Sequence, residues 1–112
     1  MSAQPDRVTV VIATSNRRPE LLRTLGRLRD LPEQPPVIVV DNASADDSPA
    51  AVRERFPAVT LRVLPRNAGA AARNVGVALA ATPYVAFSDD DSWWEPGALA
   101  FAMWLRGVAP WL

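Results

Sequence analysis

Residues 8–15 read VTVVIATS, and this stretch carries the first indication of the fold. Its first six residues are mostly β-branched and show almost no alternation of apolar and polar side chains. Runs of this kind are typical of strands that are buried on both faces, as in a parallel sheet. The run stops at Thr14-Ser15-Asn16, three residue types that favour turns and helix N-caps. The stretch therefore predicts a buried strand that ends in a polar loop.

Three further strands are predicted along the chain. Residues 37–40, VIVV, indicate a second buried strand, and residues 84–87, YVAF, indicate the last one. Residues 59–64 alternate apolar and polar side chains, so this third strand is expected near an edge of the sheet. Ser48-Pro49 is typical of an N-cap followed by proline at the first helical position. Helices are predicted near residues 19–31, 48–56, 70–81 and 98–106.

This alternation of strands and helices predicts an α/β fold. Right-handed crossovers give a Rossmann-like parallel sheet with strand order 3-2-1-4 and helices on both faces. The order reverses between strands one and four, and ligands bind beyond the carboxyl ends of strands at such a point. Polar residues follow the strands at 14–15, 41–42 and 89–91. Three clusters from distant parts of the sequence are therefore expected to converge on one rim.

The acidic triplet Asp89-Asp90-Asp91 is the most distinctive of these clusters. In extended backbone the first and third side chains point the same way, so Asp89 and Asp91 are predicted to bind one divalent cation. Oxygen ligands favour Mg²⁺ or Mn²⁺, which usually also bind substrate phosphates. The alternative is a solvated acidic loop that caps the following helix.

Four other polar residues allow a binding or a structural interpretation. Asp41 either accepts hydrogen bonds from a nucleobase or ribose, or caps the next turn. Thr14 and Ser15 are either helix-cap residues or, if the other predicted residues form a binding site, ligand contacts. Residues 67–74, NAGAAARN, lead from a loop into a helix N-terminus, where free amides favour anions. Arg73 then either contacts a diphosphate or is a surface arginine.

The roles of two pairs of neighbouring residues also have two interpretations. Arg17-Arg18 is expected to be solvated, although it lies on the predicted rim and can reach a phosphate. Trp93-Trp94 indicates core or interface packing, with stacking on a sugar or base as the alternative.

Composition limits the classes of function. The 112 residues form one domain at most. Twelve basic and twelve acidic side chains cancel, which argues against a nucleic-acid partner. The chain has no cysteine and no histidine, so any catalysis relies on carboxylates, hydroxyls, backbone amides or a metal. We expect no signal peptide and no membrane-spanning stretch, and a cytoplasmic location is expected.

The order of these motifs resembles family 2 glycosyltransferases over about residues 8–100. Residues 10–19, VVIATSNRRP, resemble the opening strand and loop of that family, and residues 39–44, VVDNAS, resemble its nucleotide-binding strand end. Residues 67–76, NAGAAARNVG, match its helix start. Residues 87–91, FSDDD, followed by Pro96-Gly97, match its D-x-D metal motif.

The resemblance implies a GT-A fold and a nucleotide-diphosphate-sugar donor. The aspartate matching Asp41 contacts the base, commonly uracil, so a UDP-sugar is the expected partner. The aspartate matching Asp89 contacts the ribose or sugar, and the one matching Asp91 reaches a Mn²⁺ or Mg²⁺ ion on the diphosphate. The metal neutralises the leaving diphosphate. The other residues expected at the donor site are Thr14, Ser15, Arg73 and Asp90.

The sequence also departs from the family. Family members are longer, and the acceptor-side base of inverting members lies beyond the D-x-D half. Glu95 does not match that base, and residues 101–112 form an atypical tail. We therefore expect residues 1–112 to be a single partial GT-A domain, the donor-binding half, which lacks the catalytic base and is prone to self-association. The acceptor stays unknown.

Two other functions remain open at this point. One is a non-catalytic nucleotide-sugar-binding module. The other is a nucleotidyltransferase, which normally has a glycine-rich loop after the first strand, whereas residues 14–18, TSNRR, contain no glycine.

Overall fold

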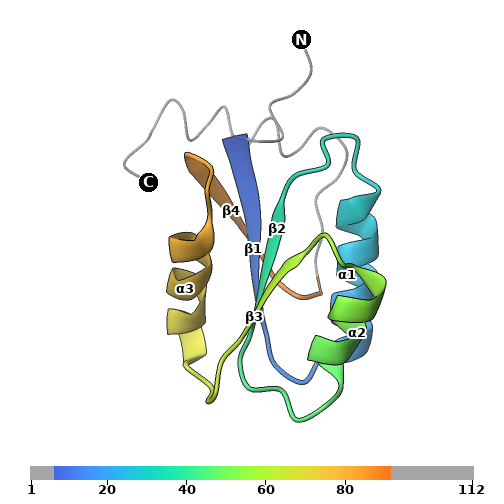
Figure 1. Cartoon of the computed structure of the whole chain (residues 1–112), viewed down its shortest axis with the longest axis vertical. Coiled ribbons are helices and arrows are strands. Elements are labelled where there is room, and N and C mark those ends of the chain that lie inside the picture. The colour runs from blue at the N-terminus through green and yellow to red at the C-terminus, as the bar shows by residue number, and fades with distance from the viewer. Residues whose placement is uncertain (1–6, 92–112) are drawn as a thin grey trace.

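The computed structural model describes residues 7–91, and within them strands alternate with helices as predicted. Figure 1 shows the arrangement, in which the strands form one central layer between helices. The elements, in chain order, are β1 (Val8–Thr14), α1 (Arg18–Arg29), β2 (Val37–Asp41), α2 (Ser48–Arg55), β3 (Thr60–Val63), the 3₁₀ turn η2 (Gly69–Ala71), α3 (Ala72–Leu79) and β4 (Tyr84–Ser88).

The four strands form one parallel sheet in the order β3-β2-β1-β4, which confirms the predicted order. In the register of the central strands, Thr14 lies beside Asp41 and Ile12 lies beside Ser88. Two residues beyond Ser88, the chain is level with Thr14. The register therefore brings the acidic triplet to the carboxyl end of β1.

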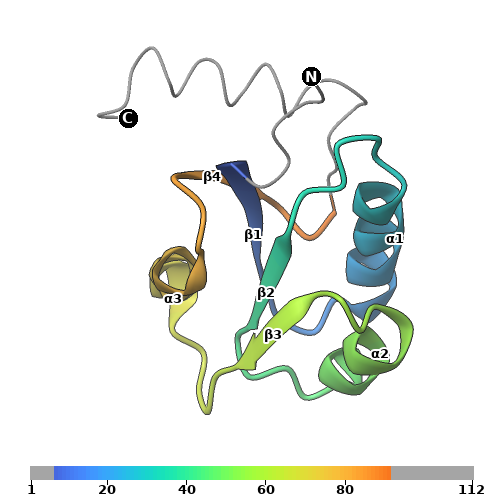
Figure 2. The same ribbon diagram turned by 45° about the horizontal axis from the view of Figure 1, so that its top comes forward.

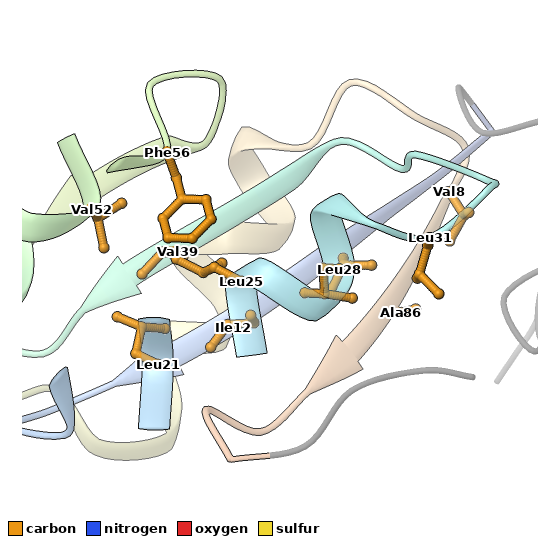
Figure 3. Close-up of a cluster of buried hydrophobic side chains, with 11 residues drawn as sticks. Val8, Ile12, Leu21, Leu25, Leu28, Leu31, Val39, Val52, Phe56 and Ala86 are labelled. Atoms are coloured by element: carbon orange, nitrogen blue, oxygen red, sulfur yellow. The ribbon is translucent and has the colours of Figure 1, made fainter. Parts of the chain in front are cut away.

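One face of the sheet is covered by α1 and α2, which lie together on the side opposite α3 (Figure 2). Leucines at steps of three and four along α1 pack on this face, because that spacing places them on one side of the helix. Figure 3 shows Leu21, Leu25 and Leu28 above the strands, next to Ile12 and Val39. This cluster also includes Val8, Val10, Leu31, Val52, Phe56 and Ala86.

The other face packs against α3. Val11, Ile38, Val40 and Val85 of the strands meet Ala72 at the start of this helix. Small residues let α3 lie close to the sheet, and a Cβ atom added at Gly76 would collide with the side chain of Val11. Since Val11 is itself fully buried, neither partner has room to move.

Gly76→Ala is therefore expected to destabilise the protein. Overpacking costs about 1–3 kcal/mol, which exceeds the roughly 1 kcal/mol that alanine gains over glycine in a helix. Urea unfolding followed by circular dichroism measures the change. Gly26→Ala on α1 is the control, since an added Cβ there meets nothing within 4 Å. Equal stability of the two variants would contradict the proposed close approach.

The boundaries of the described elements lie within two residues of the prediction, and the starts of α3 and α2 are built differently from what was expected. The helix expected over residues 70–81 starts as the 3₁₀ turn η2, with Gly69 at φ +59°, and ends at Leu79. Ser48 is not the N-cap of α2 but its first residue, and Asp47 precedes it. The capping bonds come from Asp46, whose Oδ1 accepts from both the backbone N–H and the hydroxyl of Ser48.

Several predictions fall outside the described residues. They concern the helix over 98–106, Trp93-Trp94, Glu95 and the tail 101–112.

Candidate functional site

Two loops and the end of β4 meet at the carboxyl edge of the sheet, beside β1. The hydroxyl of Thr14 donates to Oδ2 of Asp90 at 2.9 Å, across 76 positions of sequence. Ser15 Oγ donates to the carbonyl oxygen of Asn42 at 3.1 Å, and the Asn42 N–H donates to the carbonyl of Thr14 at 2.7 Å. Thr14, Ser15, Asp41 and the acidic triplet are thus brought to one rim.

The acidic triplet is not extended backbone, so that expectation is wrong. β4 ends at Ser88, and Asp90-Asp91 form a turn. The three residues differ in exposure: Asp90 is 9% exposed, whereas the side chains of Asp89 and Asp91 are 67% and 55% exposed.

Asp90 is held from three sides. Its Oδ2 accepts from Thr14, its Oδ1 lies 3.0 Å from Nε of Arg17, and its carbonyl oxygen accepts from the hydroxyl of Thr24 at 2.9 Å. Thr24 lies on α1, and both it and Thr14 are buried. These contacts tie the acidic turn to β1, to the loop after it and to α1.

The two outer aspartates each face one arginine. Nη2 of Arg73 lies 3.2 Å from Oδ1 of Asp89, and Nη2 of Arg17 lies 3.2 Å from Oδ2 of Asp91. Exposed ion pairs of this kind contribute only about 0.2–1 kcal/mol. A cation or an anion of higher charge can therefore displace them at little cost. Arg73 also places its guanidinium 5.9 Å from the ring centre of Phe87.

Asp41 is buried at the end of β2. Its Oδ2 accepts from the N–H of Ser44 at 2.8 Å, and its Oδ1 accepts from the Ser44 hydroxyl at 2.7 Å. Each carboxylate oxygen can accept a second hydrogen bond. The cap role is therefore present in the structure, and since Asp41 is only 1% exposed, a ligand would reach its oxygens only if the loop at Ser44 shifted.

Two asparagines that sequence reasoning did not single out organise the rim. Asn16, at φ +55°, accepts at Oδ1 from the N–H groups of Ala45 and Asp46, at 2.6 and 3.2 Å. Asn42 accepts at Oδ1 from the N–H of Ala68 and donates from Nδ2 to the carbonyl of Gly69. Both side chains follow a predicted strand end, which is the signal that points to them. They join the loops after β1 and β2 to their neighbours.

A neighbouring acid in the loop after β2 carries the one resolved pKa shift among the described residues. Hydrogen bonds from the hydroxyl and N–H of Ser48 lower the pKa of Asp46 below its usual value. Asp46 is therefore ionised at neutral pH and keeps its capping role there.

Metal-binding capacity at the rim rests on two carboxylates. Within residues 7–91, no group of three or more acidic side chains is close enough to hold an ion by itself. Asp89 and Asp91 remain as exposed carboxylates whose oxygens can act as metal ligands. Mg²⁺ and similar ions are commonly held by one or two carboxylates together with substrate phosphates and water. A metal bound by these two carboxylates would need its remaining ligands from a phosphate and water.

One cavity lies away from this rim. It has a volume of about 630 Å³ and lies at the opposite edge, where β2 and β3 begin. Leu25, Phe56 and Val59 form part of its wall, with Arg29 and Arg55 also lining it. The polar rim and the cavity are thus separate features at the two ends of the strands.

Solved structures with the same architecture are glycosyltransferases. The mannosyltransferase PcManGT from Pyrobaculum calidifontis, in complex with GDP-Man and Mn²⁺, superposes with a TM-score of 0.75 at 29% identity, over 94% of this chain and 34% of that one. S. aureus TarS 1-349 in complex with UDP-GlcNAc gives 0.68 and 28%, over 91% and 31%. The fold is therefore that of the GT-A glycosyltransferases.

The sequence places the chain within one family of that class. Residues 9–101 match the profile of Glycosyl transferase family 2, and the chain belongs to this family. It is 28% identical to the succinoglycan biosynthesis protein ExoU of Rhizobium meliloti, over 88% of this chain and 30% of that protein. It is 34% identical to the uncharacterized glycosyltransferase YwdF of Bacillus subtilis, over 81% and 35%. The chain thus spans about a third of the length of these relatives.

None of the helices within residues 7–91 is long and apolar enough to cross a membrane.

Proposed function

We propose that this chain binds the nucleotide-diphosphate-sugar donor of a glycosyl transfer reaction at the carboxyl edge of its sheet. The observation that carries the proposal is the Thr14–Asp90 hydrogen bond, which seats the acidic turn beside β1 in a chain of this family. Relatives with the same fold bind GDP-Man with Mn²⁺ in one case and UDP-GlcNAc in another. Both ligands are nucleotide-diphosphate sugars.

In this proposal, each residue at the rim binds a different part of the nucleotide-sugar donor. We assign Asp41, at the end of β2, to the nucleobase, and the exposed Asp89 to a ribose or sugar hydroxyl. Arg73 lies beside Asp89, and this position supports a role in binding a diphosphate oxygen. Asp91, with Asp89, would hold a Mn²⁺ or Mg²⁺ ion. When bound, the metal offsets the charge that develops on the leaving diphosphate.

We propose a supporting role at the same site for Thr14, Ser15 and Asp90. Thr14 and Asp90 are buried and bonded to each other, and Ser15 bonds to the loop after β2. We propose that they set the position of the rim, so that the exposed acids are in place before the donor arrives. A rim held in position in this way reduces the rearrangement needed when the ligand binds.

Calorimetry of the full chain with UDP, with and without Mn²⁺, tests the proposal. UDP is expected to bind in the presence of Mn²⁺ and to bind much more weakly without it. GDP and CDP are compared under the same conditions. Failure of every nucleotide to bind, with the chain folded by circular dichroism, would contradict a donor site at this rim.

Asp41→Asn is expected to change the preference among UDP, GDP and CDP. The variant keeps the shape of the side chain and turns one acceptor oxygen into a donor. A mispaired buried group costs about 1–3 kcal/mol. Here this cost would weaken the binding of the nucleobase that Asp41 is proposed to recognise. Competition calorimetry at saturating Mn²⁺ measures the preference.

Ser44→Ala is the matched control, since it removes a hydrogen-bond donor to Asp41 and leaves the carboxylate in place. An unchanged nucleotide preference in Asp41→Asn, with a loss of stability equal to that of Ser44→Ala, would mean that Asp41 only caps the loop.

The proposed role of these residues is donor binding, with the acceptor and the catalytic base supplied elsewhere. The family match favours glycosyl transfer over nucleotidyl transfer. The acidic side chains found at the rim are either engaged in holding the loops together or proposed to face the donor.

A further inference from the structure

Arg17 contacts two members of the acidic triplet at once. It precedes α1, at the end of the loop that follows β1. Its Nε lies 3.0 Å from Oδ1 of Asp90, and its Nη2 lies 3.2 Å from Oδ2 of Asp91. One guanidinium therefore bridges the buried and the exposed acid of the same turn.

The two contacts differ in how easily they break. The Asp90 side chain is only 12% exposed and is also held by Thr14, whereas that of Asp91 is 55% exposed. The Nε atom of Arg17 is buried and meets Asp90 as an ion pair without hydrogen-bond geometry, whereas Nη2 donates a hydrogen bond to Oδ2 of Asp91. Water screens the exposed Asp91 contact more than the buried Asp90 contact. Arg17 is thus held near Asp90 by a buried ion pair and bound to Asp91 by an exposed, exchangeable hydrogen bond.

We propose that Arg17 is an exchangeable counter-ion that links metal binding to donor binding. This inference rests on the proposed function. Without ligand, Nη2 neutralises Asp91, the carboxylate that the metal would use. A divalent cation on Asp91 displaces Nη2, while Nε stays on Asp90. The released Nη2 then faces the rim with an unpaired positive charge, where the donor diphosphate is expected.

This arrangement predicts opposite effects of Arg17 on the two ligands. Arg17 competes with a metal that binds alone, because both are cations on one carboxylate. It assists a nucleotide diphosphate that binds with the metal, because a guanidinium forms strong charge-assisted bonds to phosphate oxygens. A residue that merely holds the loop together would weaken both kinds of binding when it is lost.

The test compares Arg17→Gln with Arg18→Gln in the full chain. Arg18 is the next residue, and its Nε pairs with Asp47 at 3.0 Å rather than with the triplet, so both variants lose one positive charge from the same loop. Mn²⁺ affinity without nucleotide is measured by electron paramagnetic resonance. UDP affinity at saturating Mn²⁺ is measured by calorimetry, and circular dichroism reports the fold.

In Arg17→Gln, Mn²⁺ alone is expected to bind up to about fivefold more tightly, the scale of one exposed ion pair. UDP with Mn²⁺ is expected to bind at least about tenfold more weakly, as for a lost hydrogen bond to a charged group. Arg18→Gln is expected to leave both affinities near those of the unmodified chain.

Arg17→Lys separates charge from geometry and carries the test if the glutamine variant does not fold. This variant keeps one positive charge beside the triplet, but a single ammonium cannot bridge both acids in the way that the guanidinium does. We therefore expect Mn²⁺ alone to bind more tightly than in the unmodified chain, while UDP retains most of its affinity.

Loss of both affinities in folded Arg17 variants, or equal behaviour of Arg17→Gln and Arg18→Gln, would overturn the inference. These results differ from failure of the proposed function, in which the unmodified chain itself shows no Mn²⁺-dependent UDP binding.

Discussion

UDP binding by the Asp91→Ala variant is expected to be the same with and without Mn²⁺. Asp91 presents an exposed carboxylate on the turn after β4, and its guanidinium partner is held by a weak, exposed contact. A metal at such a site supplies several kcal/mol of charge stabilisation to a bound phosphate. Its loss corresponds to at least about a hundredfold in affinity. Calorimetry with UDP at matched Mn²⁺ concentrations measures the effect.

Asp47→Ala is the matched control for this prediction. Asp47 is also exposed, at 68%, and also pairs with an arginine, Arg18, but it lies in the loop after β2. The control variant is expected to keep the Mn²⁺ dependence of UDP binding. Retained metal dependence in Asp91→Ala, or an equal loss in Asp47→Ala, would contradict the assignment of the metal to Asp91.

The second large effect concerns sugar transfer by the 112-residue chain. With UDP-sugars, Mn²⁺ and a panel of acceptor alcohols, it is expected to bind donor and to form no measurable glycoside. The chain contains no histidine, and none of the acids described at the rim is assigned as a base for an acceptor. General-base assistance contributes about a hundredfold to ten-thousandfold, and positioning of the acceptor can contribute more.

Slow donor hydrolysis, with water as acceptor, is the expected residual activity. Released UDP and any glycoside are followed together by chromatography, and donor binding is measured on the same preparation. Asp91→Ala is run in parallel and should lose the hydrolysis as well. Robust glycoside formation by the unmodified chain would show that it carries its own acceptor site and base.

Much of the fold could be predicted because the strands differ in their burial. β1 is buried almost throughout and β2 nearly so, and both consist mainly of aliphatic residues. β3 lies at an edge, has two apolar and two polar residues and is largely exposed. This contrast, together with the strand–helix alternation, is sufficient for the order 3-2-1-4. The start of α2 differs from the prediction because a serine before proline resembles an N-cap, whereas Asp46 supplies the bonds.

The candidate site could be predicted as a set of converging loops but not in its internal contacts. The switch point between β1 and β4 brings Thr14 and the triplet together, as expected from topology. The turn at Asp90 could not be read from three identical residues, because their environments differ only in the folded chain. The bonds of Asn16 and Asn42 join loops 26 to 30 residues apart, and no local pattern encodes such pairs.

The cavity at the opposite edge of the sheet makes this protein suitable for a distance measurement. The chain contains no cysteine, so Arg55→Cys on the cavity wall introduces a unique thiol for a spin label. The strands between the two edges are five to seven residues long, which corresponds to roughly 20 Å. Paramagnetic broadening between the label and Mn²⁺ at the acidic turn reads out metal occupancy directly. A spin label on the cavity wall thereby reports whether a metal is bound at the other end of the strands.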